Sequence, residues 1–302
     1  MVNKLETDQS KILNTCHTTI RVVNYRFLAM APRLPLEVVN LIIDDLAKYD
    51  YKLSSIKACA LVCHSFLPLC RKHIFASVTL SDRYPSSSTS DDLNHLLSNS
   101  PHLAVYILNL DYHLNKKYKK EFIKKRVLWL LPMFKKLVKL QCLTLNYYPY
   151  SSRIKVFDWM SLYERKVLLP LLHFPTLTII NLGRIVNFPL ADLAGCVNLK
   201  KLEIQSLECL PNGAGEFLET LPPTPVMLEQ LVIDSGSMKL VQQLCDALRP
   251  DGKPVIDFSS LKEIRSNITR LDSMTELFGK CRNLYKINLA SMSLPHITSS
   301  SI

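Results

Sequence analysis

The amino-acid sequence predicts an α/β protein with a short N-terminal helical module followed by a longer, irregular solenoid of strand–helix repeats. Of the 302 residues, 48% are hydrophobic and 21% are charged, so the chain can bury a core and is not disordered throughout. It is rich in Leu and holds only 7 Gly. A short apolar motif recurs along its C-terminal two thirds, and such repetition is typical of solenoids.

The scarcity of Gly argues against several classes of enzyme. Phosphate-binding loops and nucleophile elbows need Gly where the backbone turns tightly or approaches a ligand. The one G-x-G, Gly213-Ala214-Gly215, has Leu218 where a dinucleotide fingerprint needs its third Gly. The sequence also contains no G-x-S-x-G or H-E-x-x-H motif. We therefore expect a protein that is not an enzyme, with no catalytic residue and no cofactor.

The Cys residues are odd in number, nine, and none forms a C-x-x-C pair, which indicates reduced thiols in the cytoplasm or the nucleus. Cys59, Cys63, Cys70 and His73 form a poor metal set, because Cys59 and Cys63 are one helical turn apart rather than paired in a loop. We predict no metal. The longest apolar run, residues 127–134, is far shorter than the ~20 residues that span a bilayer, so no membrane partner is expected.

Residues 1–30 lack a clean apolar period, and we expect them to be disordered or to be a non-native extension upstream of a natural start at Met30. Definite signals begin after them. Pro35 suits the first turn of a helix, where its missing N–H costs nothing. Val39, Ile42, Ile43 and Leu46 then follow at i, i+3, i+4 and i+7, which predicts one apolar helix face ending near Tyr49.

Two more helices and a strand complete a predicted module over residues 31–80. Ser54 or Ser55 caps a second helix, in which apolar residues keep helical spacing as far as Phe66. Pro68 begins a third helix that runs through Phe75, and residues 77–80 form a short strand. Residues 81–92 are Ser-rich and contain Pro85, so we expect a loop and a domain boundary there.

The recurring motif is apolar-x-x-apolar-x-apolar, and its alternation predicts a short strand with one buried face in each copy. We place copies at residues 103, 140, 177, 199, 228, 261 and 284, at intervals of 22 to 37 residues. Helical spacing between copies, as in Val241, Leu244, Cys245 and Leu248, completes a leucine-rich-repeat-like solenoid over residues 93–295, with a tail at 296–302. Chance recurrence in a Leu-rich chain is the alternative.

The N-terminal module resembles an F-box. The resemblance is carried by Leu34-Pro35-Leu36-Glu37-Val38-Val39-Asn40-Leu41-Ile42-Ile43-Asp44-Asp45-Leu46 and by Ala60-Leu61-Val62-Cys63-His64-Ser65-Phe66. The continuation Arg71-Lys72-His73-Ile74-Phe75 into Ser77-Val78-Thr79-Leu80 is similar to the F-box proteins abundant in mushroom-forming fungi. The match covers about 45 residues closely, and the Leu-rich part is similar in style only.

The resemblance implies a module that docks on the Skp-type adaptor of a cullin–RING ubiquitin ligase, while the repeat domain holds an unidentified protein substrate. The positions that match the family's adaptor contacts are Leu34, Pro35, Val38, Ile42, Leu46, Leu61, Val62 and Phe66. The family often has Trp where this chain has Phe66. From the residues alone, the apolar face would instead be buried against the chain's own core.

Substrate contacts are expected on the strand surface of the solenoid, at the variable positions inside the repeats. These positions hold Lys200, Lys201, Glu203, Glu229, Gln230, Lys262, Glu263 and Arg265. This expectation follows the general geometry of solenoids.

Positive charge is concentrated in residues 115–140, which carry nine of the eleven net positive charges. Its densest part is Lys116, Lys117, Lys119, Lys120, Lys124, Lys125 and Arg126. Apolar residues between the lysines predict a helix with one basic face. A solvated helix face, a nuclear-localisation patch and a phosphate-binding surface remain alternatives. The second hypothesis for the whole chain is therefore a nuclear protein that associates with nucleic acid or chromatin through this segment.

Overall fold

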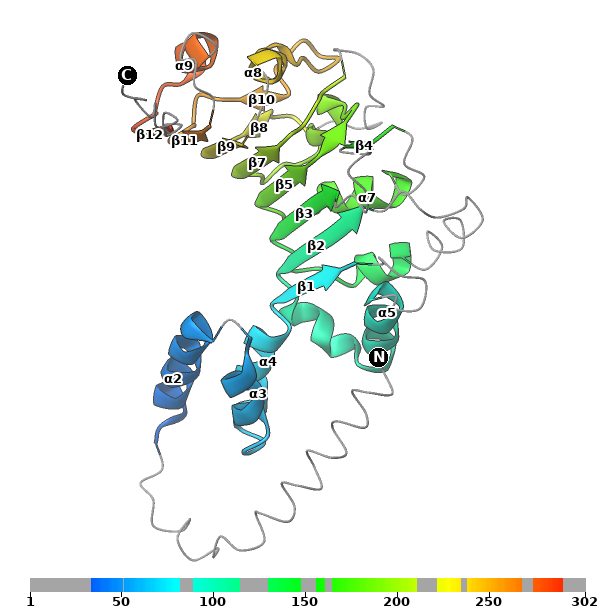
Figure 1. Cartoon of the computed structure of the whole chain (residues 1–302), viewed down its shortest axis with the longest axis vertical. Coiled ribbons are helices and arrows are strands. Elements are labelled where there is room, and N and C mark those ends of the chain that lie inside the picture. The colour runs from blue at the N-terminus through cyan, green and yellow to red at the C-terminus, as the bar shows by residue number, and fades with distance from the viewer. Residues whose placement is uncertain are drawn as a thin grey trace, which may run out of the picture. The chain divides into compact units, whose positions relative to one another are not determined.

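The structure is a computed structural model, and it describes residues 34–50, 52–81, 89–114, 130–147, 156–160, 165–210, 222–234, 238–267 and 274–289. It is a mixed α/β protein with a parallel sheet (Figure 1). The chain divides between Ile74 and Phe75 into an N-terminal helical unit and a C-terminal α/β unit. The segments predicted to be disordered, residues 1–30 and 296–302, lie outside the described residues.

The helical unit consists of α2 (Leu36–Tyr49), α3 (Ser54–Ala60) and α4 (Phe66–Ile74). Pro35 is the N-cap of α2 and so lies just before the first turn in which it was predicted, and its carbonyl accepts the backbone N–H groups of Val38 and Val39. A small core of Val39, Ile43, Ile56 and Cys70 holds the three helices together. With so few buried side chains, each one contributes a large share of the stability of this unit.

The predicted second and third helices are wrong at their ends. The second helix stops at Ala60, because the N–H groups of Leu61 and Val62 bond to carbonyls only three residues back and close the last turn. Cys63 is therefore exposed instead of continuing an apolar helix face. The third helix begins at Phe66, which leaves Pro68 within its first turn.

Asp44 joins α2 to α4 through its side chain. Its Oδ1 accepts Lys72 Nζ at 2.6 Å and His73 Nε2 at 2.7 Å. Asn40 supports the pair, since its Oδ1 accepts the same Lys72 ammonium at 2.7 Å. The hydrogen bond from Lys72, assisted by His73, outweighs desolvation and lowers the pKa of the Asp44 carboxyl.

Asp44→Asn is expected to destabilise the protein by about 1 kcal/mol at pH 6, a value that allows for partial solvent screening. Because the folded state lowers the pKa of Asp44, its contribution is present above the unfolded pKa and disappears as the pH falls through the folded pKa. Urea unfolding at pH 6 and at a pH below the folded pKa checks this. The matched control is Asp45→Asn, whose contact with Lys48 is exposed. An Asp44→Asn penalty that stays the same at both pH values would contradict the linkage.

The α/β unit is built on an eight-stranded parallel sheet in the order β1-β2-β3-β5-β7-β9-β11-β12 (Figure 1). Equivalent motif residues lie opposite one another: Leu143 pairs with Ile180, and Leu202 pairs with Leu231. The repeats therefore stack in register. The strands are β1 (Ser77–Leu80), β2 (Asn109–Leu114), β3 (Cys142–Tyr147), β5 (Ile179–Gly183), β7 (Lys201–Gln205), β9 (Gln230–Asp234), β11 (Glu263–Ser266) and β12 (Lys286–Leu289).

Six of the seven predicted motif copies fall on strands, and the copy at residue 103 is wrong. Residues 101–106 form the 3-10 helix η1 (Pro101–Tyr106), and the strand copy begins four residues later, with Leu110 and Tyr112 facing the core. Strand β1 is predicted correctly but assigned to the wrong unit. It pairs with β2 and so belongs to the sheet, which moves the boundary from residue 80 to Ile74.

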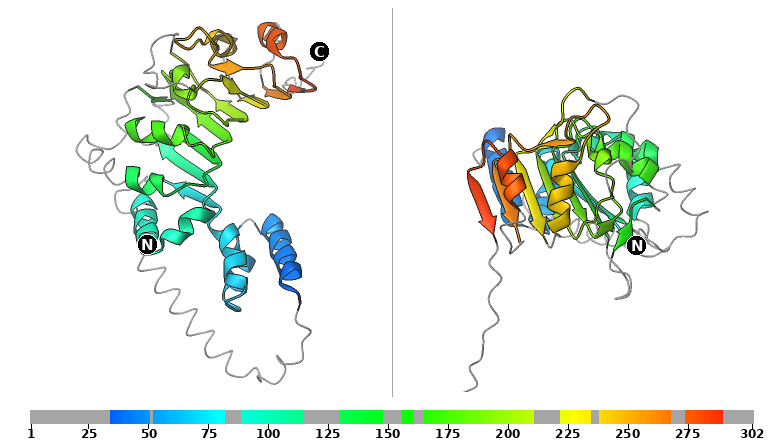
Figure 2. Two further views of the ribbon diagram at one scale, coloured as in Figure 1. Left: turned by 180° about the vertical axis from the view of Figure 1, so that it is seen from behind. Right: turned by 90° about the horizontal axis from the view of Figure 1, so that it is seen from above.

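Helices pack on one face of the sheet and leave the other face open in the part that the structure describes (Figure 2). Strand burial alternates accordingly, with the inward residues of β2, β3 and β7 buried and the outward residues half-buried.

The covering elements are α5 (Thr89–Asn99), α7 (Arg165–Leu172), η2 (Leu190–Leu193), α8 (Met238–Asp246) and α9 (Thr275–Lys280). In α8, Val241, Leu244 and Cys245 are buried as the spacing predicts, but Leu248 lies beyond the helix and is exposed. Residues 89–92, predicted as loop, begin α5.

Two short parallel pairs lie beside the main sheet: β4 (Phe157–Asp158) with β6 (Ile185–Val186), and β8 (Val226–Met227) with β10 (Ile256–Asp257). Asp192 ties this region together from η2. Its Oδ2 accepts Trp159 Nε1 at 2.8 Å, and Arg165 grips both carboxylate oxygens, at 3.1 and 2.8 Å. The Asp192 side chain has no solvent exposure, so this ion pair is internal to the core.

Candidate functional site

An exposed apolar surface covers part of the helical unit. Seven of the eight residues matched to the F-box adaptor contacts are exposed, although most are large and apolar. We call these seven the docking surface: Leu34, Pro35, Val38, Ile42, Leu46, Leu61 and Val62. The eighth, Phe66, is half-buried against the small core, so it supports this surface from within. Exposed apolar patches on soluble domains mark interaction sites.

Helix α2 carries two apolar faces where the sequence predicted one. Val39 and Ile43 are 8% and 1% exposed and point into the core, whereas Ile42 and Leu46 are 47% and 37% exposed. The exposed side chains continue helically from Val38 through Ile42 and Leu46. The periodicity of the sequence identified the apolar positions but merged these two faces.

The sequence reasoning missed three further exposed apolar residues beside the docking surface, Leu36, Leu41 and Tyr49. Tyr49 lies three residues after Leu46 and extends its stripe by one helical turn. The signal that could have found them is the excess of apolar residues in α2, which is more than one face of a helix can bury.

The eight residues predicted for substrate contacts lie on neighbouring strands in the C-terminal half of the sheet. Each is on, or immediately before, β7, β9 or β11. Most are paired with one another. Glu229 accepts Lys200 at 3.2 Å and Lys262 at 2.7 Å, and Lys201 contacts Glu203 at 3.1 Å. The hydrogen bonds from Lys262 and Lys200 lower the pKa of Glu229, so this carboxylate is ionised near neutral pH.

Glu263 is the centre of a second cluster. Its Oε1 accepts Arg265 Nε at 2.7 Å and Lys286 Nζ at 3.0 Å, and these contacts lower the pKa of the carboxyl. Gln230 approaches the other oxygen at 3.4 Å. Lys286 was missed in the sequence, although it occupies the same motif position as Lys201, directly before the second apolar residue of its copy.

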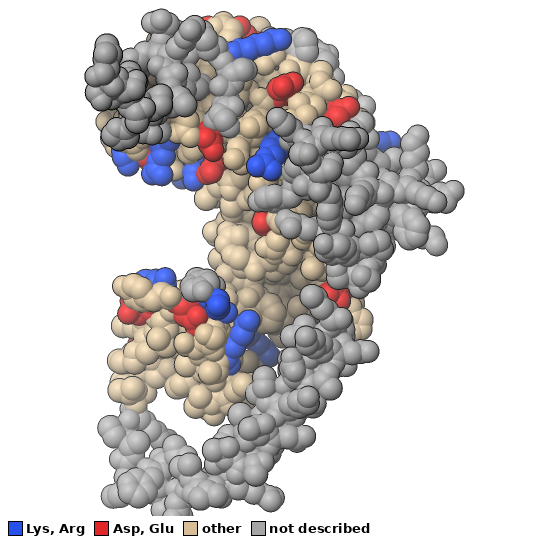
Figure 3. Space-filling view, viewed as in Figure 1, with Lys and Arg blue, Asp and Glu red and all other residues tan. Residues whose placement is uncertain are grey.

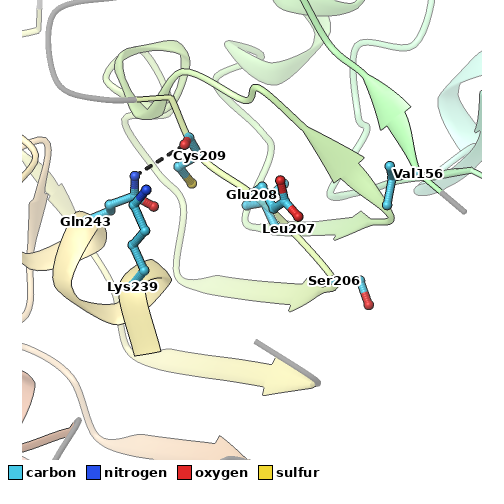
Figure 4. A pocket seen from close by; sticks show the side chains of 7 residues that line it. All are labelled: Val156, Ser206, Leu207, Glu208, Cys209, Lys239 and Gln243. Carbon is cyan, nitrogen blue, oxygen red and sulfur yellow. Dashed lines mark hydrogen bonds between the residues drawn. The ribbon is translucent and has the colours of Figure 1, made fainter. Parts of the chain in front are cut away.

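A pocket of about 420 Å³ lies between the turn after β7 and α8 (Figure 4). Lys239 and Gln243 reach it from α8, and Gln243 Nε2 donates to the carbonyl of Cys209 at 3.2 Å. Burial raises the pKa of the Cys209 thiol to about 12, which keeps it protonated and a poor nucleophile. The pocket therefore offers polar contacts to a ligand, and its cysteine is not an activated nucleophile.

Among the described residues, no group of three or more His, Cys, Asp or Glu side chains is placed to hold a metal ion. The basic residues Lys116, Lys117, Lys119, Lys120, Lys124, Lys125 and Arg126 lie outside the described residues, so the predicted basic helix stays a prediction. Within the described ranges, no helix is long and apolar enough to cross a membrane.

No family model matches the chain, and no curated protein matches it. The function is therefore argued from the two surfaces described above, the docking surface of the helical unit and the open strand face of the α/β unit.

Proposed function

We propose that this protein is the substrate-receptor subunit of an SCF-type cullin–RING ubiquitin ligase. In this proposal the helical unit is an F-box that binds a Skp-type adaptor, and through it a cullin. The α/β unit is a leucine-rich-repeat-like solenoid that holds a protein substrate. The observation that carries the proposal is the docking surface, because residues matched to the F-box adaptor contacts are exposed while their neighbours form a separate core.

Helix α2 buries some of its apolar residues and exposes others, and this favours an apolar face that binds an adaptor over one that packs only on the chain's own core. An apolar face that served only the chain's own core would bury Ile42 and Leu46 together with Ile43. Instead Ile42 and Leu46 are exposed, and so is Leu61, which follows α3. A partner that covers these side chains would remove their apolar area from water, which is the main favourable term in protein association.

The proposed mechanism is positional. The ligase chemistry would belong to other subunits, and this chain would raise the effective concentration of the substrate near the ubiquitin carrier. The described strand face suits such a role, since the in-register strands hold its side chains on a regular backbone scaffold. Under this proposal the protein acts in the cytoplasm, the nucleus or both.

The test is adaptor recovery from host lysate with the full chain, comparing wild type with Leu34→Ala/Pro35→Ala. Wild type is expected to retain the adaptor, and the double variant is expected to lose most of it because it removes apolar side chains at one end of the docking surface. Lys48→Ala, an exposed change on α2, is the matched control and should retain the adaptor. Wild-type protein that recovers no adaptor would refute the proposal.

A further inference from the structure

The open strand face divides sharply by charge. Strands β1, β2, β3 and β5 contain no Lys or Arg, and Asp111 is their only acidic residue. In contrast, β7, β9, β11 and β12, with the residues directly before β7, β9 and β11, hold five cations and four carboxylates, those of Glu203, Glu229, Asp234 and Glu263. Figure 3 shows Lys and Arg side chains gathered along the sheet near β9, β11 and β12, with fewer Asp and Glu beside them. The five cations are Lys200, Lys201, Lys262, Arg265 and Lys286.

In this half of the sheet, two carboxylates each form ion pairs with two cations. Glu229 holds Lys200 and Lys262, and Glu263 holds Arg265 and Lys286. Each cluster therefore keeps one net positive charge, whereas the Lys201–Glu203 pair is neutral. We call the two clusters together the cation-rich patch.

In both clusters the carboxylate is less exposed to solvent than the cations that it pairs with. The Glu263 side chain is only 9% exposed, while its partners Arg265 and Lys286 are 55% and 48% exposed. Glu229 is likewise less exposed than Lys200 or Lys262. The less exposed carboxylates thus hold the cations in place without covering their outer sides. Holding long side chains in advance lowers the entropy lost when a ligand binds them.

Backbone hydrogen bonds fix the spacing of these charges. Glu229 N–H donates to Lys200 O at 2.8 Å, and Lys262 N–H donates to Glu229 O at 2.8 Å, so the three residues form one row across adjacent strands. Lys200 and Lys262 are therefore two strand spacings apart, roughly 10 Å. An extended peptide covers that distance in about three residues.

We propose that the cation-rich patch binds an acidic, extended segment of the substrate protein. The inference rests on the proposed function only in taking the strand face as the substrate-binding surface. Its occupant is argued from charge complementarity, because a patch with four outward cations and two recessed carboxylates attracts anions and repels basic partners. Glu203 and Asp234 border a hollow of about 540 Å³ beside Arg265, so the acidic segment is placed over the cations of the patch and not in that hollow.

The probe is a fluorescein-labelled peptide of about nine residues with Glu at every second position, which places its carboxylates on one side of an extended chain, and binding is measured by anisotropy at about 0.15 M salt. The full chain is expected to bind it, and Lys262→Gln/Arg265→Gln is expected to weaken binding at least about tenfold. The charge-preserving swap Lys262→Arg/Arg265→Lys should keep most of the affinity. A peptide with Lys in place of Glu should not bind.

Two controls separate the patch from the general positive charge of the chain. Lys48→Gln/Lys57→Gln removes the same charge from the helical unit, and Lys116→Gln/Lys117→Gln removes it from the basic segment. Equal losses in either control and in the patch variant would overturn the proposal. Tighter binding of a single-stranded RNA of equal charge, lost in the patch variant, would overturn it in favour of a nucleic-acid site.

The same peptide measured with Ile42→Asp/Leu61→Asp separates the two proposals, since that variant changes only the docking surface. Unchanged peptide affinity together with no adaptor binding in wild type would refute the ligase function and leave the patch intact. Adaptor binding with no peptide binding to wild type would refute the patch and leave the ligase function intact.

Discussion

Asp192→Ala is expected to lower the free energy of unfolding by about 3–5 kcal/mol, the largest effect of any single exchange considered for the α/β unit. The Asp192 carboxylate is fully buried and takes hydrogen bonds from both Trp159 and Arg165. Its removal leaves the Arg165 guanidinium, only 11% exposed, without this counter-charge and leaves the indole N–H without its acceptor. Leaving one buried charge without its partner destabilises the folded state by more than the intact ion pair stabilises it.

Urea unfolding followed by circular dichroism measures this effect. Arg165→Met/Asp192→Leu should be much less destabilised than Asp192→Ala, because it removes both charges instead of one. Glu276→Gln is the surface control: it breaks the exposed ion pair with Lys280 and is expected to cost less than about 0.5 kcal/mol. A loss below about 1 kcal/mol in Asp192→Ala would contradict the account of a buried, charge-paired centre.

Under the proposed function, Ile42→Asp is expected to reduce adaptor affinity by about 100-fold while changing stability by less than about 0.5 kcal/mol. The Ile42 side chain is 47% exposed, so the folded protein can hydrate a carboxylate there, whereas an apolar partner surface cannot. The neighbouring exchange Ile43→Asp places the same charge at a position that is 1% exposed. We expect it to unfold the helical unit.

The measurement is titration calorimetry with a purified adaptor, with thermal unfolding of each variant recorded in parallel. Lys48→Asp, an exposed position on the same helix, serves as the charge control and should bind normally. Wild-type affinity in Ile42→Asp would mean that the adaptor does not use this face. Loss of folding in Ile42→Asp would mean that Ile42 belongs to the core of the unit.

The sequence predicted most of the strand positions because alternation of apolar residues is a local property. Copies such as Leu199-x-x-Leu202-x-Ile204 become strands with Leu202 and Ile204 buried. The copy at residue 103 has the same spacing, yet it follows Pro101 and forms a 3-10 helix. The pattern alone could not separate the two, because Leu103 and Ala104 are also buried, in a helical turn instead of a strand.

Gly183 also shows what the sequence could predict and what needed the structure. The sequence count argued only against Gly-rich loops. The structure gives a reason for Gly183: it lies opposite Asn146 on β3, and a Cβ there would meet the Asn146 Oδ1 at 2.5 Å. This requirement comes from a residue 37 positions away in the chain, so no local pattern could reveal it.

The sequence by itself determined where most of the strands lie, since the alternation of apolar residues is a property of neighbouring residues. Only the tertiary structure decided which apolar side chains are covered and which charges meet. It separated Ile42 from Ile43 on one helix, and it gathered Lys200, Glu229 and Lys262 from three repeats into one cluster. Burial and ion pairing depend on contacts between residues distant in the chain, so they appear only once the strands are stacked.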